Sequence, residues 1–300
     1  MKLYYFKDPH GNFGDDLNPW LWQQLWGDIF NEHDTDLFVG VGTLLNHRIP
    51  AATGVTVFGS GHGYGELPKH HKDWTFYAVR GPLTAKAFGL PDELAITDPA
   101  SLAPRFHKYR GPKLHKVSFM PHCESARLGD WAKVCALAGI HYIDPRQPFL
   151  QVFDAICQSE RLLTEAMHGA ILADSFRVPW VPVKAYRHIS EYKWQDWLMS
   201  VGLNCPFQAL KPVWRGDDHL NTTSRLKNQL KRGLRHTPLW QKSWGNPPPK
   251  ASTPRQIEQT ASELRQLCHA KTYLSTDAVF AANTERLLAT VARFKQEQGV

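Results

Sequence analysis

The sequence has few of the features that mark disulfide-rich, zinc-binding or membrane-spanning proteins. Its five cysteines are scattered and form no CxxC pair, which argues against a zinc ribbon and against a disulfide framework. No run of about 18 apolar residues occurs, so we expect no membrane-spanning helix. The first sixteen residues become acidic and turn-rich without a long apolar stretch, so we expect no secretory signal and a cytoplasmic protein.

Two common phosphate-binding fingerprints are also missing. The glycine-rich stretch 59–63 has neither the spacing of a GxGxxG motif nor the GK[ST] ending of a P-loop. The net charge of +7, with fifteen histidines that add charge below neutrality, favours an anionic partner such as a phosphorylated substrate or a membrane surface. Nucleic acid would require aromatic residues interleaved with the basic ones, or a known binding module. Neither occurs, so we expect no nucleic-acid partner.

The length of the chain points to more than one domain. At 300 residues it is too long for one small core, and two domains with an appendage are the natural expectation. A charged, turn-rich stretch at 105–113 marks the first boundary. We therefore predict an N-terminal α/β lobe at 1–110, a C-terminal α/β lobe at 111–205, and a basic, helical C-terminal extension at 206–300.

Short apolar strands that alternate with helices indicate parallel α/β layers. In the first lobe, strands are expected at 2–6, 36–42, 55–61, 74–81 and 94–100. The first helix is expected to start at Pro19 with Asn18 as its N-cap, because proline suits the first helical position.

The second lobe repeats the alternation more regularly. Strands at 116–122, 141–145, 161–165 and 180–184 are expected to alternate with helices at 127–140, 148–160 and 167–179. After about residue 205 the strand signals stop, and two helices are expected at 254–269 and 276–297.

Ligands of open α/β sheets bind beyond the carboxyl ends of the strands, so the polar residues at those ends are candidates for a site. The first such loop holds Asn12, Gly14, Asp15 and Asp16. Glycine lets the backbone approach a ligand closely, and the aspartates are suited to orient a hydroxyl group or to take its proton. The alternative is a tight turn in which one aspartate caps the following helix.

Two further strand ends of the first lobe carry candidates. Ser60, Gly61 and His62 lie in a glycine-rich loop, which is alternatively a plain bend. Arg80 follows a strand, where a guanidinium group can bind a carboxylate or phosphate in bidentate fashion. A structural ion pair at the strand end is the alternative for Arg80.

His168 is the most informative residue of the second lobe. It begins a helix after a buried strand, where backbone N–H groups and the helix dipole favour an anion, and Gly169 follows it. A histidine there can donate a proton, and Glu165, at the strand end, can act with it. His122 ends a neighbouring strand. The alternative for His168 is a buried structural histidine.

In combination these motifs resemble the polysaccharide pyruvyl transferase family, in its exopolysaccharide, succinoglycan-type branch. The resemblance rests on GNFGDDLNPWL, GVGTLL, GSG, YAVRGPLTAKAFG, TDPA and SERLLTEAMHGAILADSFRVPWVPV, whose order and separation together make it specific. It covers roughly residues 3–200. The resemblance implies two Rossmann-like lobes in a GT-B-like arrangement.

The resemblance also implies phosphoenolpyruvate as donor, a pair of sugar hydroxyl groups as acceptor, and a cyclic pyruvate ketal as product, with no metal and no other cofactor. His168 matches the expected acid, and Arg80 matches the arginine thought to bind the anionic donor. The residues expected at the donor are Arg80, His168, Gly169, Ser60, Gly61 and His62. Those expected at the acceptor are Asn12, Gly14, Asp15 and His122. Those expected in catalysis are His168, Asp15, Asp16 and Glu165.

One position departs from the family pattern. Many members carry an arginine two residues before this histidine, and here that residue is Ala166. Either Arg80 or Arg161 therefore binds the phosphate alone, or Glu165 has a different role in this branch.

The sequence thus predicts a pyruvyl transferase that acts on a sugar of a surface polysaccharide, with a lipid-linked oligosaccharide as the expected acceptor. The basic segment 224–236 has leucines at i+4 spacing and is suited to contact the inner face of the membrane, unless it packs on the body as a solvated helix. Two rivals remain. One is a GT-B-type glycosyltransferase that uses a nucleotide sugar, and the other is a non-catalytic scaffold of a polysaccharide export complex.

Overall fold

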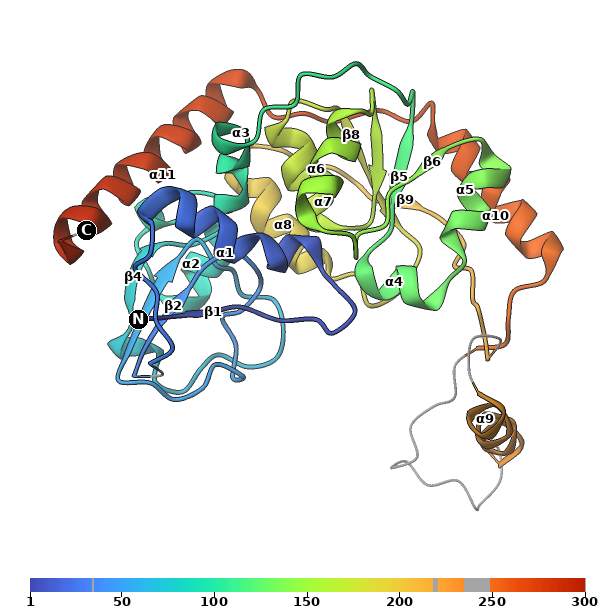
Figure 1. Cartoon of the computed structure of the whole chain (residues 1–300), viewed down its shortest axis with the longest axis horizontal. Helices are drawn as coiled ribbons and strands as arrows, with labels where there is room; N and C mark the ends of the chain where they lie inside the picture. The colour runs from blue at the N-terminus through green and yellow to red at the C-terminus, as the bar shows by residue number, and fades with distance from the viewer. Residues whose placement is uncertain (34, 218–220, 235–248, 300) are drawn as a thin grey trace.

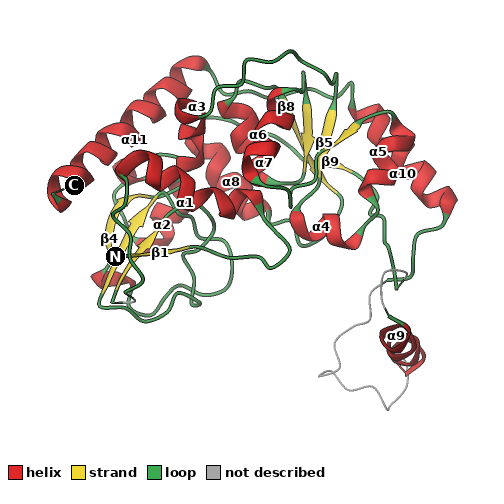
Figure 2. Cartoon of the chain, in the orientation of Figure 1, coloured by secondary structure: helices red, strands yellow, loops and turns green. Residues whose placement is uncertain are grey.

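The chain folds into two parallel sheets with accompanying helices, which lie side by side in the computed structural model (Figures 1 and 2). The structure describes residues 1–33, 35–217, 221–234 and 249–299. The two sheets are compatible with the two Rossmann-like α/β lobes that the alternation of strands and helices predicts.

The N-terminal sheet has four parallel strands in the order β1-β2-β3-β4. They are β1 (Lys2–Tyr4), β2 (Asp36–Val39), β3 (Gly54–Phe58) and β4 (Thr75–Ala78). The helical segments of this lobe are α1 (Phe13–Trp26), η1 (His71–Asp73), α2 (Pro82–Phe88), η2 (Asp92–Leu94), η3 (Pro99–Leu102) and α3 (Ala103–Phe106). The strands are shorter than predicted because the glycine-rich strand ends turn out of the sheet.

The strand predicted at 94–100 is wrong. This segment forms the short turns η2 and η3, and it meets the sheet through an isolated bridge between Val79 and Ala95. Pro99 has no N–H for a strand ladder, and the Asp98 carboxylate accepts the N–H of Ala100 at 3.0 Å, which caps η3. Asp98 is thereby held, fully buried, beyond the end of the sheet.

The C-terminal sheet has five parallel strands in the order β6-β5-β7-β8-β9. They are β5 (Ser118–Met120), β6 (His141–Tyr142), β7 (Leu162–Thr164), β8 (Trp180–Lys184) and β9 (Gln208–Ala209). Helices α4 (Cys123–Leu128), α5 (Trp131–Ala138), α6 (Phe149–Cys157) and α7 (Met167–Ser175) connect the first four strands. β9 lies after residue 205, so the expectation that strands stop there is wrong.

Helix α1 begins earlier than predicted. Its N-cap is Asn12, whose side chain accepts the N–H of Gly14, and Pro19 lies inside the helix. Proline removes the N–H that would bond to the carbonyl of Asp15, and the side chain of Asn18 donates to that carbonyl instead, at 2.9 Å. The prediction of Asn18 as N-cap is therefore wrong. The same amide also bonds to the backbone of Val41, which ties α1 to the loop after β2.

Helix α1 lies between the lobes and contributes apolar side chains to a core that both lobes share (Figure 1). Trp20 contacts Phe106, Phe149 and Phe153 at ring-centroid distances of 5.4–6.2 Å. Burial of such aromatic pairs contributes on the order of 1 kcal/mol each beyond their area. The loop before α1 is therefore fixed where the lobes meet.

Residues 206–300 do not form a separate extension in the described parts of the chain. Helix α10 (Pro254–Leu267) packs on α5 of the C-terminal lobe through Ile257, Ala261 and Leu264. Helix α11 (Asp277–Gln298) returns to the N-terminal lobe, where the Phe294 ring lies 4.5 Å from that of Trp26 (Figure 1). These buried faces make both helices part of the lobes.

The predicted boundary at residue 205 also needs correction, because the chain returns to the first lobe before it. Helix α8 (Glu191–Ser200) follows β8 and packs against α2. Its Asp196 accepts hydrogen bonds from the Thr84 backbone and side chain, at 2.9 and 2.6 Å. Side chains on α8 therefore reach the space between the lobes from the C-terminal half of the sequence.

Helix α9 (Thr222–Leu234) stands away from both lobes (Figure 1). Arg232 forms an ion pair with Asp217, while Leu226 and Leu230, on another face, are 58% and 60% exposed. Residues 235 and 236 of the predicted membrane-contact segment lie outside the described residues. Within the described parts of the chain, no helix combines the length and the apolar character needed to cross a bilayer.

Candidate functional site

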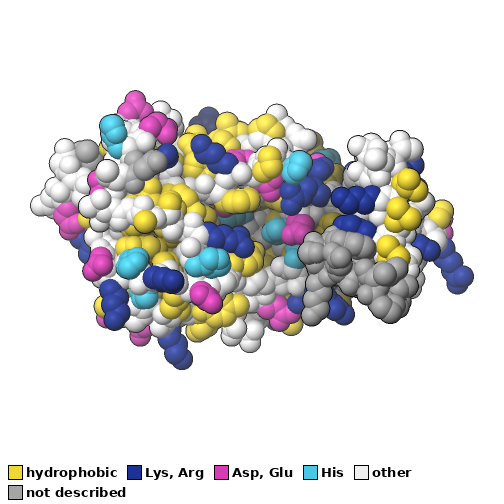
Figure 3. Space-filling model, turned by 90° about the horizontal axis from the view of Figure 1, so that it is seen from below, with side chains coloured by type: hydrophobic (Ala, Val, Ile, Leu, Met, Phe, Trp, Pro, Cys, Tyr) yellow, Lys and Arg dark blue, Asp and Glu magenta, His cyan; other side chains and the backbone are white. Residues whose placement is uncertain are grey.

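A cavity of about 410 Å³ lies between the two lobes and is lined by side chains from both. Basic and histidine side chains gather around the hollowed surface between the lobes in Figure 3. The polar lining residues from the N-terminal lobe include Asn12, Asp15, Thr43, Asn46, Arg48 and Tyr64. Those from the C-terminal half include His122, Glu124, Arg127, Glu165, His168, His188 and Lys193.

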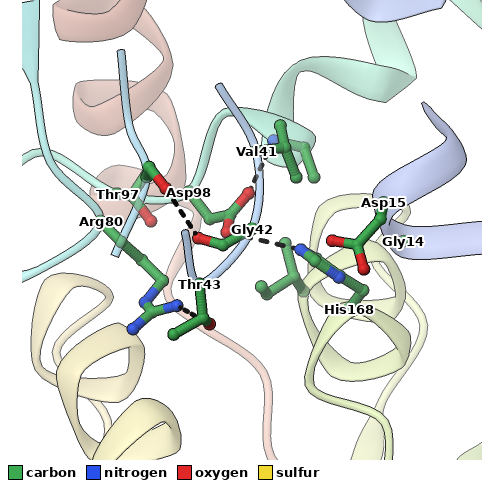
Figure 4. Close-up of polar contacts among 12 residues, drawn as sticks. Gly14, Asp15, Val41, Gly42, Thr43, Arg80, Thr97, Asp98 and His168 are labelled. Atoms are coloured by element: carbon green, nitrogen blue, oxygen red, sulfur yellow. Dashed lines mark hydrogen bonds and ion pairs between the residues drawn. The ribbon is translucent and has the colours of Figure 1, made fainter. Parts of the chain in front are cut away.

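His168 lies at the start of α7 and faces a buried carboxylate. Its Nε2 is 3.6 Å from Oδ2 of Asp98, and neither atom forms a hydrogen bond within the described chain. Asp98 is fully buried, and its other oxygen accepts the N–H of Ala100. Nε2 is thus buried against Asp98, while Nδ1, the other ring nitrogen, lies beside Gly14 of α1. Figure 4 shows the imidazole between Asp98 and Asp15.

Gly14 makes room for this imidazole. A Cβ at residue 14 would collide with Nδ1 and Cγ of His168, so only glycine allows the ring to lie against α1. Gly14 is therefore a packing residue. It does not line the cavity, and its N–H donates to the side chain of Asn12 at 3.3 Å, so the predicted acceptor contact does not fit this geometry. The close approach joins the first loop of one lobe to the catalytic candidate of the other.

Asp15 lines the cavity beside His168. Burial raises its pKa to about 6, and the nearby charges of His168 and Lys193 oppose that rise. The side-chain amide of Asn12 donates to Oδ2 of Asp15. Gly42, at a φ of 129°, brings backbone close to the other carboxylate oxygen. Asp15 is thus a buried carboxylate whose proton affinity suits exchange near neutral pH.

Asp16 has a different environment from Asp15. Its carboxylate accepts the backbone N–H of Asn12 at 3.0 Å and closes the N-terminus of α1, and it does not line the cavity. The catalytic role predicted for Asp16 therefore gives way to the capping alternative.

Glu165 lines the cavity but is already bonded to the protein. It is fully buried and accepts the N–H of Ala185 at 2.7 Å and that of His122 at 3.4 Å. Burial raises its pKa, and the hydrogen bonds to its carboxylate oppose that rise. These bonds join the ends of β5, β7 and β8, so Glu165 positions the loops of the C-terminal lobe.

His122 and His188 form a neighbouring imidazole pair with ring centroids 5.4 Å apart. Nδ1 of His122 accepts the N–H of Glu124 at 3.2 Å, which leaves its proton on Nε2. Burial, together with the charges of Lys193 and others, holds the pKa of His122 well below its usual value. Burial also lowers the pKa of His188. His122 is thus a neutral hydrogen-bond donor at the cavity.

Arg80 is not among the cavity-lining residues. Its fully buried guanidinium group pairs with Asp196 at 3.0 Å and donates to Oγ1 of Thr43 at 2.8 Å and to the carbonyl of His62 at 2.9 Å. The donor contact predicted for Arg80 does not fit this geometry, and the ion-pair alternative does. Figure 4 shows Arg80 directed at Thr43, with Thr43 between it and the rest of the site.

The glycine-rich loop after β3 also lies behind the cavity surface. Ser60 is fully buried and donates to the carbonyl of Gly42 at 3.1 Å, and a Cβ at Gly61 would collide with the Arg80 guanidinium. Nδ1 of His62 bonds to the carbonyl of Leu45 at 2.7 Å. None of Ser60, Gly61 and His62 lines the cavity, so the donor contacts predicted for them are replaced by support of Arg80 and the β2 loop.

Two further predicted positions have structural surroundings. A Cβ at Gly169 would lie 2.6 Å from Oγ1 of Thr164 and 2.8 Å from Sδ of Met120, so this glycine allows close packing of α7 on the sheet and does not line the cavity. Arg161, at the opposite end of β7, donates to the carbonyl of Cys268. Neither Arg161 nor Arg80 therefore replaces the arginine missing at Ala166.

Asp98 and Lys193 are the most important residues to which the sequence analysis assigns no role. Asp98 belongs to the TDPA motif and is among the polar groups expected at strand ends, and its Asp-Pro pair favours a capped turn. Lys193 and Asp196 lie three residues apart on α8, on the same helical face as the buried Trp197. Charged residues on a buried face are unusual, and this pattern would have marked them.

Comparison with known proteins was made by sequence. No family model matches the chain. The chain is 47% identical over 207 residues to the succinoglycan biosynthesis protein ExoV of Rhizobium meliloti (strain 1021). The match covers 68% of this chain and 66% of that protein, so the chain spans just under two thirds of its relative's length.

Proposed function

Because the chain belongs to the polysaccharide pyruvyl transferase family, in its exopolysaccharide, succinoglycan-type branch, we propose that it transfers the enolpyruvyl group of phosphoenolpyruvate to a sugar and forms a pyruvate ketal. The relative named above is a succinoglycan biosynthesis protein, which supports a polysaccharide as the acceptor. We also infer a GT-B-like arrangement of the two lobes, because the cavity lies between two facing parallel α/β units.

The observation that carries this proposal is the position of His168 between the carboxylates of Asp98 and Asp15, beside the cavity. Asp98 faces one ring nitrogen of His168 at 3.6 Å and can orient the imidazole, as carboxylates do in catalytic triads. The other ring nitrogen, Nδ1, then delivers a proton to a ligand. Asp15, on the adjoining helix, is available as the base (Figure 4).

The proposed reaction begins with His168. Nδ1 gives its proton to the methylene carbon of phosphoenolpyruvate, whose π electron pair forms the new C–H bond and leaves C2 oxocarbenium-like. An acceptor hydroxyl then attacks C2 and gives its proton to Asp15. The C2–O bond to phosphate breaks, and the bonding pair leaves with the phosphate group.

A second hydroxyl of the same sugar completes the ketal. It adds to C2, and its proton returns to His168, while the proton held by Asp15 leaves with the phosphate as hydrogen phosphate. Of the two protons lost by the sugar, one therefore ends on the new methyl group and the other on phosphate. Asn12 positions Asp15 through its side-chain amide, and the neutral His122 donates a hydrogen bond to the bound substrates.

The acceptor in the cell is proposed to be a lipid-linked oligosaccharide at the cytoplasmic face of the membrane. Helix α9 supports this location, because Leu226 and Leu230 are exposed on one face and Lys227 is exposed beside them. Apolar side chains flanked by lysines suit an interface with anionic lipid.

Substitution of His168 tests the proposal directly. We expect His168→Gln to lower phosphate release from phosphoenolpyruvate in the presence of acceptor oligosaccharides by about 10²–10⁴-fold, because a general acid contributes that much. Mass spectrometry of the acceptor checks the gain of one pyruvyl unit. Near-normal turnover by the variant would refute the assignment of His168. If nucleotide sugars, and not phosphoenolpyruvate, raised the melting temperature of the wild-type protein, the glycosyltransferase hypothesis would replace the pyruvyl transferase hypothesis.

A further inference from the structure

Lys193 is a buried ammonium group at the cavity that has no carboxylate partner. The residue is 9% exposed, and in the described chain no carboxylate oxygen lies within 4.0 Å of its Nζ. Its nearest polar contact is the hydroxyl of Tyr64, and Nζ lies over the Tyr64 ring at 4.5 Å from the centroid. A neutral hydroxyl and a ring face satisfy only part of the ammonium's hydrogen-bonding capacity.

An ammonium group held in this way is costly unless something else compensates it. Removing a charged group from water disfavours the folded state unless an opposite charge is close. Asp15 is near enough for the Lys193 charge to affect its pKa, but the two do not form an ion pair. The missing negative charge can therefore come from an anion bound in the cavity.

The surroundings of Lys193 suit a phosphate group. Arg127 lines the same cavity but pairs with Asp8 at 3.4 Å, so its charge is already compensated. Burial, together with the charge of Lys193, lowers the pKa of His122 and His188, which leaves neutral imidazoles beside the lysine. One unpaired ammonium group with a neutral hydrogen-bond donor beside it matches the several acceptor oxygens of a phosphate. The carboxylates Asp15 and Asp98 lie with His168, where proton transfer is required.

Contacts of helix α8 position Lys193. Asp196 on this helix pairs with Arg80 and bonds to Thr84, which fixes α8 against the N-terminal lobe. Lys193 lies one helical turn before Asp196, so the same contacts hold its side chain at the cavity. A Cβ at Gly63 would lie 2.5 Å from Cγ of Lys193, which shows how closely the lysine stem is packed there.

We propose that Lys193 binds the phosphate group of the donor, and that the buried pair of Arg80 and Asp196 positions it. This assignment rests on the proposed function and supplies the cation that Ala166 lacks and that neither Arg80 nor Arg161 provides. Arg80 is then a positioning residue, since it acts on the ligand through α8.

Binding measurements on the full chain test the assignment. Isothermal titration would compare inorganic phosphate, phosphoenolpyruvate and pyruvate as probes for wild type and for Lys193→Met, which keeps a long unbranched side chain. We expect the variant to bind phosphate and phosphoenolpyruvate about 10- to 100-fold more weakly, because a charge-assisted contact is lost. Pyruvate carries only the carboxylate and is expected to keep its affinity.

Thermal melting without any ligand separates a binding role from a structural one. If Lys193 is an uncompensated charge in the empty cavity, Lys193→Met melts at or above the wild-type temperature, whereas a structural lysine would lower it. Phosphate should raise the melting temperature of wild type but not of the variant. Lys133→Met, on the exposed face of α5, is the matched control and should respond to phosphate as wild type does.

The outcomes distinguish this assignment from the proposed function. A wild-type protein that binds neither phosphoenolpyruvate nor phosphate overturns both. A wild type that turns over phosphoenolpyruvate, beside a Lys193→Met variant of unchanged phosphate affinity, overturns only the role of Lys193. Loss of pyruvate affinity with phosphate binding intact would also overturn it, because the lysine would then bind the carboxylate.

Discussion

Replacement of Asp15 by asparagine is expected to stabilise the protein while it slows catalysis. Asp15 is 9% exposed, and burial raises its pKa from 3.8 to about 6. The folded protein therefore opposes ionisation of this carboxylate. Asparagine has nearly the same shape, remains neutral, and keeps an oxygen that can accept the hydrogen bond from Asn12.

The size of the effect follows from the pKa difference. A tenfold change in proton affinity corresponds to about 1.4 kcal/mol. The rise in the pKa of Asp15 from 3.8 to about 6 therefore means that the ionised side chain lowers the free energy of unfolding by about 3 kcal/mol. Because the folded pKa is raised, this cost is absent below about pH 4 and complete above about pH 6. At roughly 2 °C per kcal/mol for a chain of this size, Asp15→Asn should melt on the order of 6 °C higher at pH 7.5.

Melting curves of wild type and Asp15→Asn between pH 4.5 and 7.5 provide the assay. The advantage of the variant should grow as the pH rises through about 6, while phosphate release falls by about 10²–10⁴-fold. Asp16→Asn is the control, since Asp16 caps α1 outside the cavity and should show no pH-dependent gain. A lower melting temperature of Asp15→Asn at pH 7.5, or a difference that does not change with pH, would refute this reasoning.

Two other predictions follow from the surroundings of His168 and from helix α9. Asp98→Asn should retain the cap of η3, because asparagine caps as well as aspartate, yet lower kcat by roughly 10²–10⁴-fold without loss of phosphoenolpyruvate affinity, as steady-state kinetics and titration would show. Unchanged kcat would exclude Asp98 as the partner of His168. The full chain should sediment with anionic vesicles and less so with neutral ones, and replacement of Leu226 and Leu230 by glutamate should abolish this. Equal sedimentation of that variant would exclude α9 as the contact.

The sequence predicted the sheets better than it predicted the loops. Apolar runs that end in glycine locate most strands, because parallel strands are buried on both faces and need little besides apolar β-formers. The segment 94–100 misleads, since its apolar residues point to a strand while Asp98 and Pro99 favour a capped turn. Local capping chemistry prevailed there because proline cannot donate to a ladder.

The strand-end rule found part of the site. Asn12, Asp15, His122, Glu165 and His168 all line the cavity, because the carboxyl ends of both parallel sheets supply its walls. The rule could not separate side chains that face the cavity from those that point back into the protein.

Arg80 shows how the rule fails. It stands at the end of β4, as an anion-binding arginine would, but its partner Asp196 comes from α8. A contact between residues 116 positions apart leaves no trace in the local sequence. When the partner is not known, the sequence around Arg80 is compatible both with a bidentate contact to a ligand and with a buried ion pair.

Helix α8 connects these observations. It follows the last long strand of the C-terminal lobe but packs on the N-terminal lobe. Its side chains therefore reach the cavity from a helix that crosses between the lobes, and the strand-end rule does not find them. The arginine absent at Ala166 would lie at the N-cap of α7, within one lobe, whereas Lys193 lies on α8, which contacts both lobes. A bound phosphate at Lys193 would therefore contact both lobes at once, and donor binding would also stabilise the lobe arrangement that brings His168 next to Asp15. This coupling requires the Arg80–Asp196 pair, so a fully buried ion pair that does not line the cavity still contributes to donor binding.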